Sequence, residues 1–161
     1  MIQEKELSIN INSPIGEIKV TVSGGALTNI QLRPKNADTQ PDAKQINLIK
    51  NIIRQIENYF DNATSSFNLP LAPQGTTFQQ KVWKSLQDIP PGETRTYAEL
   101  AKQLNTSARA IGNACRANPI PIIIPCHRIV GAKNAGGFMG ETAGASLDIK
   151  KWLLQHEGVK S

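Results

Sequence analysis

The segment that decides the fold runs from residue 96 to residue 117 and has the sequence TYAELAKQLNTSARAIGNACRA. It opens with a Thr-x-x-Glu pattern at Thr96 and Glu99, which is typical of a helix start because each side chain caps a backbone amide. The first predicted helix ends near Leu104, residues 105–107 break and re-cap the chain, and a second helix covers residues 108–117. Two short helices joined by about three residues form a helix-turn-helix.

The second predicted helix carries charge on one face and small residues along its length. Arg109 and Arg116 are seven positions apart and therefore project from the same face. Gly112, together with several alanines, keeps the helix thin and permits close approach to another backbone. These features suit contact with nucleic acid, and tight packing inside the protein accounts for the small residues equally well.

The positive charge of the chain is concentrated in its second half. Residues 74–161 carry eleven basic and six acidic side chains, which accounts for the whole net charge of +5. The stretch between Glu99 and Glu141 has no carboxylate and five basic residues, which are Lys102, Arg109, Arg116, Arg128 and Lys133. A positive surface is expected there and would attract DNA or RNA, although chance clustering on a solvated face remains an alternative.

The residues before this segment predict a separate lobe with a small sheet and one helix. Apolar and polar residues alternate in residues 7–11 and 18–22, and a Ser-Gly-Gly turn leads into a third strand at residues 27–32. A helix over residues 42–60 is indicated by apolar residues spaced three and four apart, which are Ile46, Ile49, Ile53, Ile56 and Phe60. Residues 69–75 are rich in Pro and Gly and predict a linker.

The predicted organisation is therefore a mixed α/β (α+β) fold in two lobes, residues 1–73 and residues 74–161. The second lobe begins with a helix at residues 77–86 and closes with a helix from about Ser146 to Glu157. The chain has no apolar run near the ~18 residues that a membrane span requires. Its first residues lack the basic start and apolar run of a signal peptide, so we expect a cytoplasmic protein.

Residues 118–130 present a cysteine in unusual surroundings. Prolines at positions 119, 121 and 125 exclude a helix and predict an extended, buried segment that delivers Cys126. A buried thiol is inert unless a base or a positive charge lies near it, and His127 follows directly. Because adjacent side chains of an extended chain point to opposite faces, we expect a water molecule to link His127 to the thiol.

A histidine that acts as a base toward a thiol usually needs a third group to orient it, and Glu157 is the best candidate. On sequence alone, a solvent-exposed Glu157 at a frayed helix end is the favoured alternative. The two histidines and two cysteines lack the spacing of a metal site, so we expect no metal. Two cysteines are also too few for a disulfide framework, so Cys115 and Cys126 are expected to be free thiols.

At Pro125-Cys126-His127-Arg128-Ile129-Val130 the chain resembles the O6-alkylguanine-DNA alkyltransferase family, whose signature is Pro-Cys-His-Arg followed by two β-branched residues. The resemblance covers nearly all of the second lobe. Its further motifs are Phe78-Gln79-x-x-Val82-Trp83, Pro91-Gly92-Glu93-Thr94-x-Thr96-Tyr97, Ala108-Arg109-Ala110-Ile111-Gly112, Arg116-x-Asn118-Pro119 and Trp152-Leu153-Leu154-x-His156-Glu157. The strand and helix pattern of the first lobe is compatible with the ribonuclease-H-like N-terminal domain of the family.

This resemblance implies repair of O6-alkylguanine in double-stranded DNA by irreversible, single-turnover transfer of the alkyl group to Cys126, without a cofactor. His127, Glu157 and a bridging water would withdraw the thiol proton, and Asn118 would brace the loop. It leaves activity on O4-alkylthymine open.

The resemblance also implies that the helix-turn-helix enters the minor groove and rotates the target base out of the duplex. Arg109 would fill the vacated space, Tyr97 would press on the target phosphate, and Gly112 and Arg116 would face the DNA. Pro121 and the carbonyls of Cys126 and Ile129 would contact the guanine.

The chain departs from the family pattern near residues 137–140, in a loop over residues 140–145 that is longer than usual, and at Cys115. Near residues 137–140 the family commonly has a Tyr that closes the base pocket, and here Phe138 or Met139 takes its place. Cys115 lies on the predicted recognition helix where a larger apolar side chain is common. It is either a packed small residue or a second alkylation site.

Three other functions remain as alternatives. A lesion-binding protein would grip alkylated DNA without repairing it, but would not need Cys126. A Cys-His thiol hydrolase would turn over and would not need Arg109. A plain DNA-binding regulator would dimerise and bind a specific sequence, whereas we expect a monomer.

Overall fold

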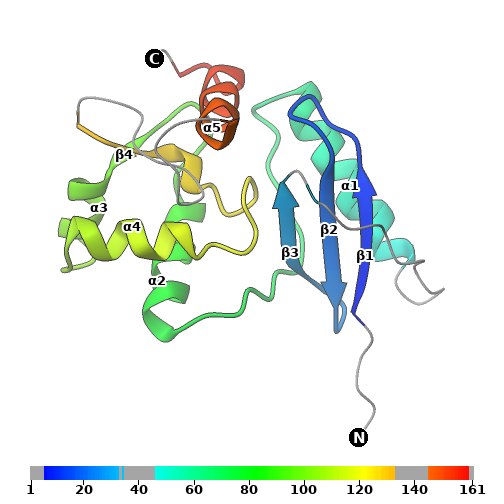
Figure 1. The fold of residues 1–161 in the computed structure, drawn as a ribbon, viewed down its shortest axis with the longest axis horizontal. Coiled ribbons are helices and arrows are strands. Elements are labelled where there is room, and N and C mark those ends of the chain that lie inside the picture. The colour runs from blue at the N-terminus through cyan, green and yellow to red at the C-terminus, as the bar shows by residue number, and fades with distance from the viewer. Residues whose placement is uncertain (1–5, 33, 35–45, 133–144, 160–161) are drawn as a thin grey trace, which may run out of the picture. The chain divides into compact units, whose positions relative to one another are not determined.

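The computed structural model describes residues 6–32, 34, 46–132 and 145–159. The chain divides into two compact units, Met1–Gln74 and Gly75–Ser161. The first contains a three-stranded antiparallel sheet and a helix, and the second is mostly helical (Figure 1). This confirms the mixed α+β fold class predicted from the sequence.

The sheet of the first unit contains β1 (Leu7–Ile11), β2 (Ile18–Ser23) and β3 (Ala26–Leu32), in the order β1-β2-β3. The three predicted strands are confirmed. The alternating residues Ile18, Val20 and Val22 of β2 are buried, as expected for one face of a strand, whereas Leu7 is the buried member of the alternating set in β1. The turn from β2 to β3 contains Gly24 and Gly25, both with positive φ. This conformation suits glycine and matches the twist of a tight hairpin.

The helix of the first unit, α1 (Ile46–Asp61), buries a different face from the predicted one. Its buried residues are Ile49, Ile52, Ile56 and Tyr59, whereas Ile53 and Phe60 are only half-buried. Residues 52 and 53 are both apolar, and so are residues 59 and 60. Two neighbouring faces of the helix therefore fit the three-and-four spacing. Packing against the core selects between them. The part of the predicted helix at residues 42–45 lies outside the described residues.

The predicted linker at residues 69–75 is wrong in part, because it pairs with the sheet. Leu71 forms a parallel bridge with Leu27. The Leu27 amide donates to the Pro70 carbonyl over 2.8 Å, and the Ala72 amide donates to the Leu27 carbonyl over 2.9 Å. On this segment the pairing needs one donor, the Ala72 amide. Pro70 and Pro73 lack an amide hydrogen but stand where no donor is needed, so they do not interrupt the pairing.

The second unit contains α2 (Thr77–Gln87), α3 (Tyr97–Gln103), α4 (Ala108–Arg116) and α5 (Ala145–His156). A short 3₁₀ helix, η1 (Cys126–Arg128), precedes β5 (Ile129–Val130), which pairs in parallel with β4 (Arg95–Thr96). α3 and α4 pack together as the predicted helix-turn-helix. The capping box at Thr96 and Glu99 is confirmed, and Ser107 caps α4 through the Ala110 amide.

Trp83 anchors the core of this unit. It is 1% exposed, and its indole Nε1 donates to the Ala114 carbonyl over 2.8 Å, which ties α2 to α4. Its ring also lies against Gly75, where a Cβ would stand 2.6 Å from Trp83 Cζ3. The glycine therefore permits a close approach that any other residue would obstruct.

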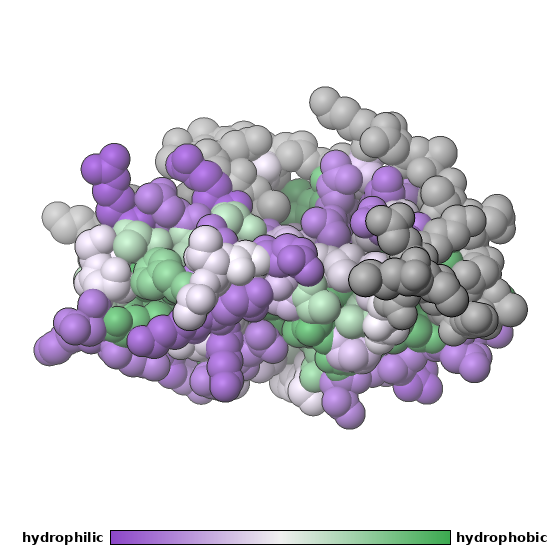
Figure 2. All heavy atoms as spheres, turned by 90° about the horizontal axis from the view of Figure 1, so that it is seen from below, coloured by the Kyte–Doolittle hydropathy of each residue, from purple (hydrophilic) through white to green (hydrophobic). Residues whose placement is uncertain are grey.

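The surface seen in Figure 2 is mainly hydrophilic, with smaller hydrophobic areas between the polar side chains. Among the helices in the described part of the chain, none combines the length and the apolar composition needed to cross a membrane.

Candidate active site

The loop that presents Cys126 is a series of turns and not the extended segment predicted from its prolines. Residues 119–120 bend, residues 121–123 form a turn, Ile122 has a φ of 77°, and Cys126 begins the 3₁₀ helix η1. Pro125 precedes that helix with a φ of −82°. Proline excludes an α-helix interior but is compatible with a helix start, so a single helical turn forms after it.

Asn118 braces this loop from inside. Its Nδ2 donates to the Ile124 carbonyl over 2.7 Å, and its Oδ1 accepts from the Ile120 amide over 2.9 Å. The side chain is buried, and it satisfies the buried Ile120 amide, while the Ile124 carbonyl also accepts from the Cys126 amide. Asn118 therefore holds the chain on both sides of the strained Ile122.

The Cys126 thiol is almost completely enclosed, since the residue is 4% exposed. Burial raises the pKa of this thiol, while a hydrogen bond from the Asn118 side chain and the positive charge of Lys150 act in the opposite direction. The isolated thiol would therefore stay protonated at neutral pH, and reaction through a thiolate requires a group that takes the proton.

His127, Arg128 and Glu157 form a buried hydrogen-bonded cluster. His127 Nε2 lies 2.7 Å from Glu157 Oε2. Arg128 Nε donates to Glu157 Oε1 over 2.8 Å, and Arg128 Nη2 donates to Glu157 Oε2 over 3.0 Å. His127 is 0% exposed and Glu157 is 8% exposed. The cluster joins η1 to the end of α5.

The exposed, frayed Glu157 favoured from sequence is therefore wrong. The Glu157 amide donates to the Leu153 carbonyl, so the helical turn continues through this residue. Gly158 then ends the turn with a φ of 87°. Gly92 lies close to the same point, because a Cβ there would stand 3.1 Å from the Glu157 carbonyl oxygen. Packing and two basic partners hold the carboxylate inside the protein.

Arg128 was predicted to contribute to a positive surface, and this prediction is also wrong. The residue is 6% exposed, and its third contact is a donation from Nη1 to the Ile89 carbonyl over 2.6 Å. Its charge is neutralised by Glu157, so it does not contribute to a field outside the protein.

His127 has one ring nitrogen engaged and one without a partner. Burial lowers the pKa of His127, Glu157 raises it, and the charges of Arg128 and Lys150 lower it further. Nδ1 is buried and has no hydrogen-bond partner among the described residues. A neutral ring with a vacant Nδ1 has the properties of a general base.

Lys150 was not identified from the sequence. This residue of α5 is 0% exposed, and its Nζ donates to the Ile129 carbonyl over 2.6 Å. Burial lowers its pKa to about 8, and the thiols of Cys126 and Cys115 raise it. One sequence signal was available: Lys150 and Glu157 are seven positions apart, so they share a face of one helix.

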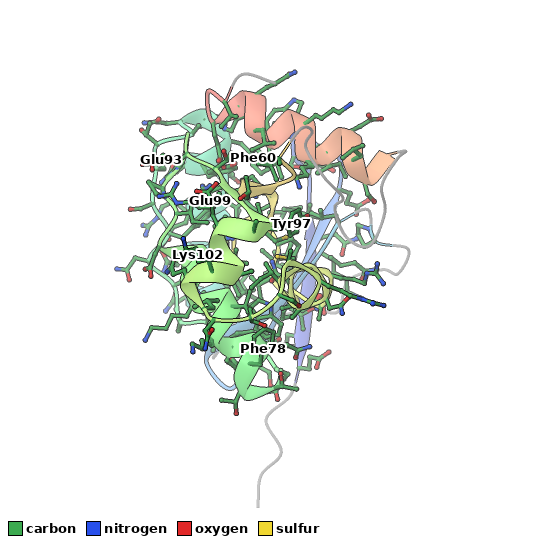
Figure 3. The ribbon with its side chains drawn as sticks, turned by 90° about the vertical axis from the view of Figure 1, so that its left-hand side faces the viewer. Phe60, Phe78, Glu93, Tyr97, Glu99 and Lys102 are labelled. Atoms are coloured by element: carbon green, nitrogen blue, oxygen red, sulfur yellow. The ribbon has the colours of Figure 1, made fainter. Side chains whose placement is uncertain are left out.

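Tyr97 lies near Lys150 at the start of α3, and Figure 3 shows it together with Glu99 and Lys102 of the same helix. The pairing of β4 with β5 brings it there, because Thr96 is opposite Val130. Lys150 Nζ lies 6.0 Å from the Tyr97 ring centroid. Burial, with smaller contributions from Cys115 and Cys126, raises the pKa of Tyr97 to about 12.

The candidate DNA-contacting residues are on α4. Arg109 and Arg116 are both exposed, and Gly112 is half-buried next to Tyr97, with a Cβ position 3.9 Å from Tyr97 Cε1. Cys115 is buried on the same helix, and burial raises the pKa of its thiol, with Cys126 adding to the effect.

The residues expected to form a base pocket are placed only in part. Pro121 and Ile129 are buried in the loop and in β5, respectively. Phe138 and Met139 lie outside the described residues. Within the described ranges, no group of three or more His, Cys, Asp or Glu side chains is arranged to hold a metal ion.

Two family models match the chain. Residues 77–159 match the DNA-binding domain of 6-O-methylguanine DNA methyltransferase, and residues 9–73 match its ribonuclease-like domain.

Individual relatives agree with this result. A methylated-DNA--protein-cysteine methyltransferase from Methanosarcina acetivorans is 42% identical over 91% of this chain and 94% of its own length. The Haemophilus influenzae protein of that name is 36% identical over 91% of this chain and 83% of its own length.

Solved structures show the same similarity. The O6-methylguanine methyltransferase of Mycobacterium tuberculosis is 35% identical with a TM-score of 0.80, over 95% of this chain and 93% of that one. Mycobacterium tuberculosis OGT in complex with DNA is 37% identical with a TM-score of 0.75, over 93% and 91% of the two chains. Both family models, the level of identity and the buried Cys126 site show that this chain belongs to the 6-O-methylguanine DNA methyltransferase family.

Proposed function

We propose that this chain repairs alkylated DNA by transferring the alkyl group of O6-alkylguanine to Sγ of Cys126, once per molecule. The observation that carries the proposal is the buried Cys126 thiol followed in η1 by a buried His127, whose Nε2 contacts Glu157 and whose Nδ1 has no hydrogen-bond partner among the described residues. Relatives named methylated-DNA--protein-cysteine methyltransferase support it over most of the chain.

The site residues divide the chemical work as follows. His127 Nδ1 takes the thiol proton through a water molecule, and Glu157 stabilises the imidazolium that results. The Cys126 thiolate then attacks the alkyl carbon, a carbon–sulfur bond forms, and the bond from that carbon to O6 breaks. Guanine leaves with the electron pair and is neutralised by a proton at its oxygen or ring nitrogen. The thioether is not hydrolysed, so no cofactor is needed and no second turnover follows.

Burial serves this reaction because it keeps the thiol protonated until the base acts. A thiolate in a low-dielectric site is poorly solvated and therefore a stronger nucleophile than one in water. Asn118 contributes by holding the loop and by favouring the thiolate.

The helix-turn-helix is proposed to bind double-stranded DNA through its minor groove. Arg109 and Arg116 are exposed on α4, and Gly112 allows the helix to approach the DNA backbone. Arg109 fills the space that the rotated base leaves, while Tyr97 presses on the target phosphate. Rotation costs a few kcal/mol, and less for a damaged pair, which favours lesions.

The base pocket is proposed to include Pro121, Ile129 and the carbonyl of Cys126, with Phe138 or Met139 closing it. The Ile129 carbonyl already accepts from Lys150. A carbonyl oxygen has two lone pairs, so it is able to accept a second hydrogen bond from the guanine.

We further propose a two-domain monomer with a boundary near residue 73, which the division into compact units at Gln74 and Gly75 supports. A cytoplasmic location is proposed because both cysteines are free and the reaction requires a reduced Cys126.

The decisive test is intact-protein mass spectrometry after incubation with a duplex that contains O6-methylguanine. Wild type and Cys115→Ala are expected to gain one methyl group and to saturate at one equivalent, whereas Cys126→Ala gains none. A methyl group on Cys126→Ala would move the acceptor to another residue. Tight, selective binding of the lesion with no mass change would favour a lesion-binding protein instead.

A further inference from the structure

Arg128 is buried and donates from each of its three guanidinium nitrogens, yet the proposed reaction gives it no task. Its guanidinium makes two parallel hydrogen bonds to the Glu157 carboxylate, 2.8 Å and 3.0 Å long, and a third, 2.6 Å long, to the Ile89 carbonyl. The bidentate arrangement fixes the plane of the carboxylate, and the contact with Ile89 fixes the guanidinium in turn.

We propose that Arg128 is a positioning residue that selects the neutral His127 tautomer with a vacant Nδ1, by keeping Glu157 ionised and turned toward His127 Nε2. This inference rests on the proposed function, because a vacant Nδ1 is what proton removal from Cys126 requires.

The tautomer follows from the hydrogen bonds around Glu157. Both carboxylate oxygens accept from Arg128, and Oε2 also lies 2.7 Å from His127 Nε2. An ionised carboxylate only accepts, so the proton of this last contact belongs to His127 Nε2. A neutral imidazole has one N–H, and Nδ1 is therefore the acceptor. Nδ1 has no partner in the described part of the chain, as a vacant base atom requires.

Arg128 also limits how strongly Glu157 attracts a proton to the histidine. A carboxylate alone would raise the pKa of His127 and hold it as an imidazolium, whose Nδ1 carries hydrogen and accepts nothing. The charge of Arg128 offsets that of Glu157, and the pKa of His127 is lowered by burial with help from Arg128.

Among the described residues, few other charges near His127 could produce this effect. Lys150 of α5 acts in the same direction as Arg128. Helix α2 also packs against η1, but Lys81, Lys84 and the cap residue Asp88 are exposed. Cys126 of η1 is neutral before the reaction, because burial raises its pKa.

Lysine could not replace Arg128 in full. An ammonium group supplies charge at one point, whereas the guanidinium matches both carboxylate oxygens and still reaches a backbone carbonyl. Arg128→Lys therefore keeps the electrostatic part of the effect and loses the orienting part.

The first test is ¹⁵N NMR of the histidine rings in unreacted wild-type protein near neutral pH. We expect His127 to have a protonated Nε2 and an unprotonated Nδ1. A ring protonated at Nδ1, or at both nitrogens, would overturn the inference. Since this measurement needs neither DNA nor a folded variant, it remains informative if Arg128 variants fail to fold. It also separates the inference from the proposed function, whose failure would appear as absence of methyl transfer.

The second test is the pH dependence of the single-turnover methyl-transfer rate for Arg128→Met, Arg128→Lys and a control, Arg54→Met, which removes an exposed arginine from α1. We expect the acid limb of Arg128→Met to move upward by about 1 to 3 pH units, as loss of one nearby charge would produce. Its rate should recover at higher pH, Arg128→Lys should lie between, and the control should match wild type. An equal loss of rate at every pH, with the tautomer unchanged, would reduce Arg128 to a structural role and refute the proposal.

Discussion

Removal of the Asn118 side chain tests the loop that presents Cys126. In Asn118→Ala, the Ile120 amide and the Ile124 carbonyl both lose their side-chain partner. Ile120 and Ile124 are each 0% exposed, so bulk water does not reach these groups directly. The Ile124 carbonyl keeps its hydrogen bond from the Cys126 amide, so the substitution leaves one donor, the Ile120 amide, unsatisfied inside the protein.

The expected cost follows from the Ile120 amide. An unsatisfied buried backbone group costs about 1 to 3 kcal/mol, so Asn118→Ala should lower the free energy of unfolding by about 1 to 3 kcal/mol. A water molecule that occupied the space of the side chain would bring the loss toward the lower figure. The thiol of Cys126 also loses a hydrogen bond that favours the thiolate, so its alkylation should slow as well.

Urea denaturation followed by tryptophan fluorescence measures the loss, since Trp83 is buried in the same unit. Asn113→Ala is the matched control, because Asn113 is exposed on α4 and its replacement should change stability by less than about 0.5 kcal/mol. Asn118→Asp keeps the acceptor for Ile120 but turns an oxygen toward the Ile124 carbonyl, so it should also destabilise. A loss below about 1 kcal/mol in Asn118→Ala would refute the bracing role.

Three further predictions concern the second unit. The pKa of Lys150 is about 8 in the folded protein and 10.5 ordinarily. The free-energy cost of burying the charged ammonium group is therefore present in full below pH 8 and disappears as the pH rises toward 10.5. Urea titrations in reducing buffer should therefore show wild type gaining about 3 kcal/mol relative to Lys150→Met across that range, and a constant difference would contradict the buried charge. Gly75→Ala places a Cβ 2.6 Å from Trp83 Cζ3 and should lower the free energy of unfolding by about 1 to 3 kcal/mol, with a change in tryptophan emission. An unchanged urea midpoint would show instead that the Trp83 ring moves aside freely. Thr96→Ala removes the hydroxyl that accepts from the Glu99 amide and should cost about 1 kcal/mol in thermal unfolding, while Thr96→Ser should retain most of it.

Local patterns were sufficient to predict most of the helices and strands. The cap at Thr96 and the break at residues 105–107 act over three or four residues, so the helix-turn-helix could be located without the structure. The same local rules could not choose the buried face of α1, because Ile52 and Ile53 fit the spacing equally well.

The candidate site was predicted by residue type and not by arrangement. Cys126, His127, Glu157 and Asn118 were identified, but the loop was expected to be extended and Glu157 exposed. Prolines exclude an α-helix without deciding among turns, since one proline is compatible with each of several turn conformations. Whether a carboxylate at a helix end is buried depends on the partners that other segments supply.

By itself, the sequence determined the α+β fold class and the helix-turn-helix and offered Cys126 as the candidate reactive thiol, since these depend on periodicity, capping and a continuous motif. Only the tertiary structure decided which charged side chains are buried together. Arg128 and Glu157 are 29 positions apart, and Lys150 and the Ile129 carbonyl are 21 apart. A charge enters the interior only where a partner from a distant segment compensates its lost hydration, and no local pattern records where that partner will be.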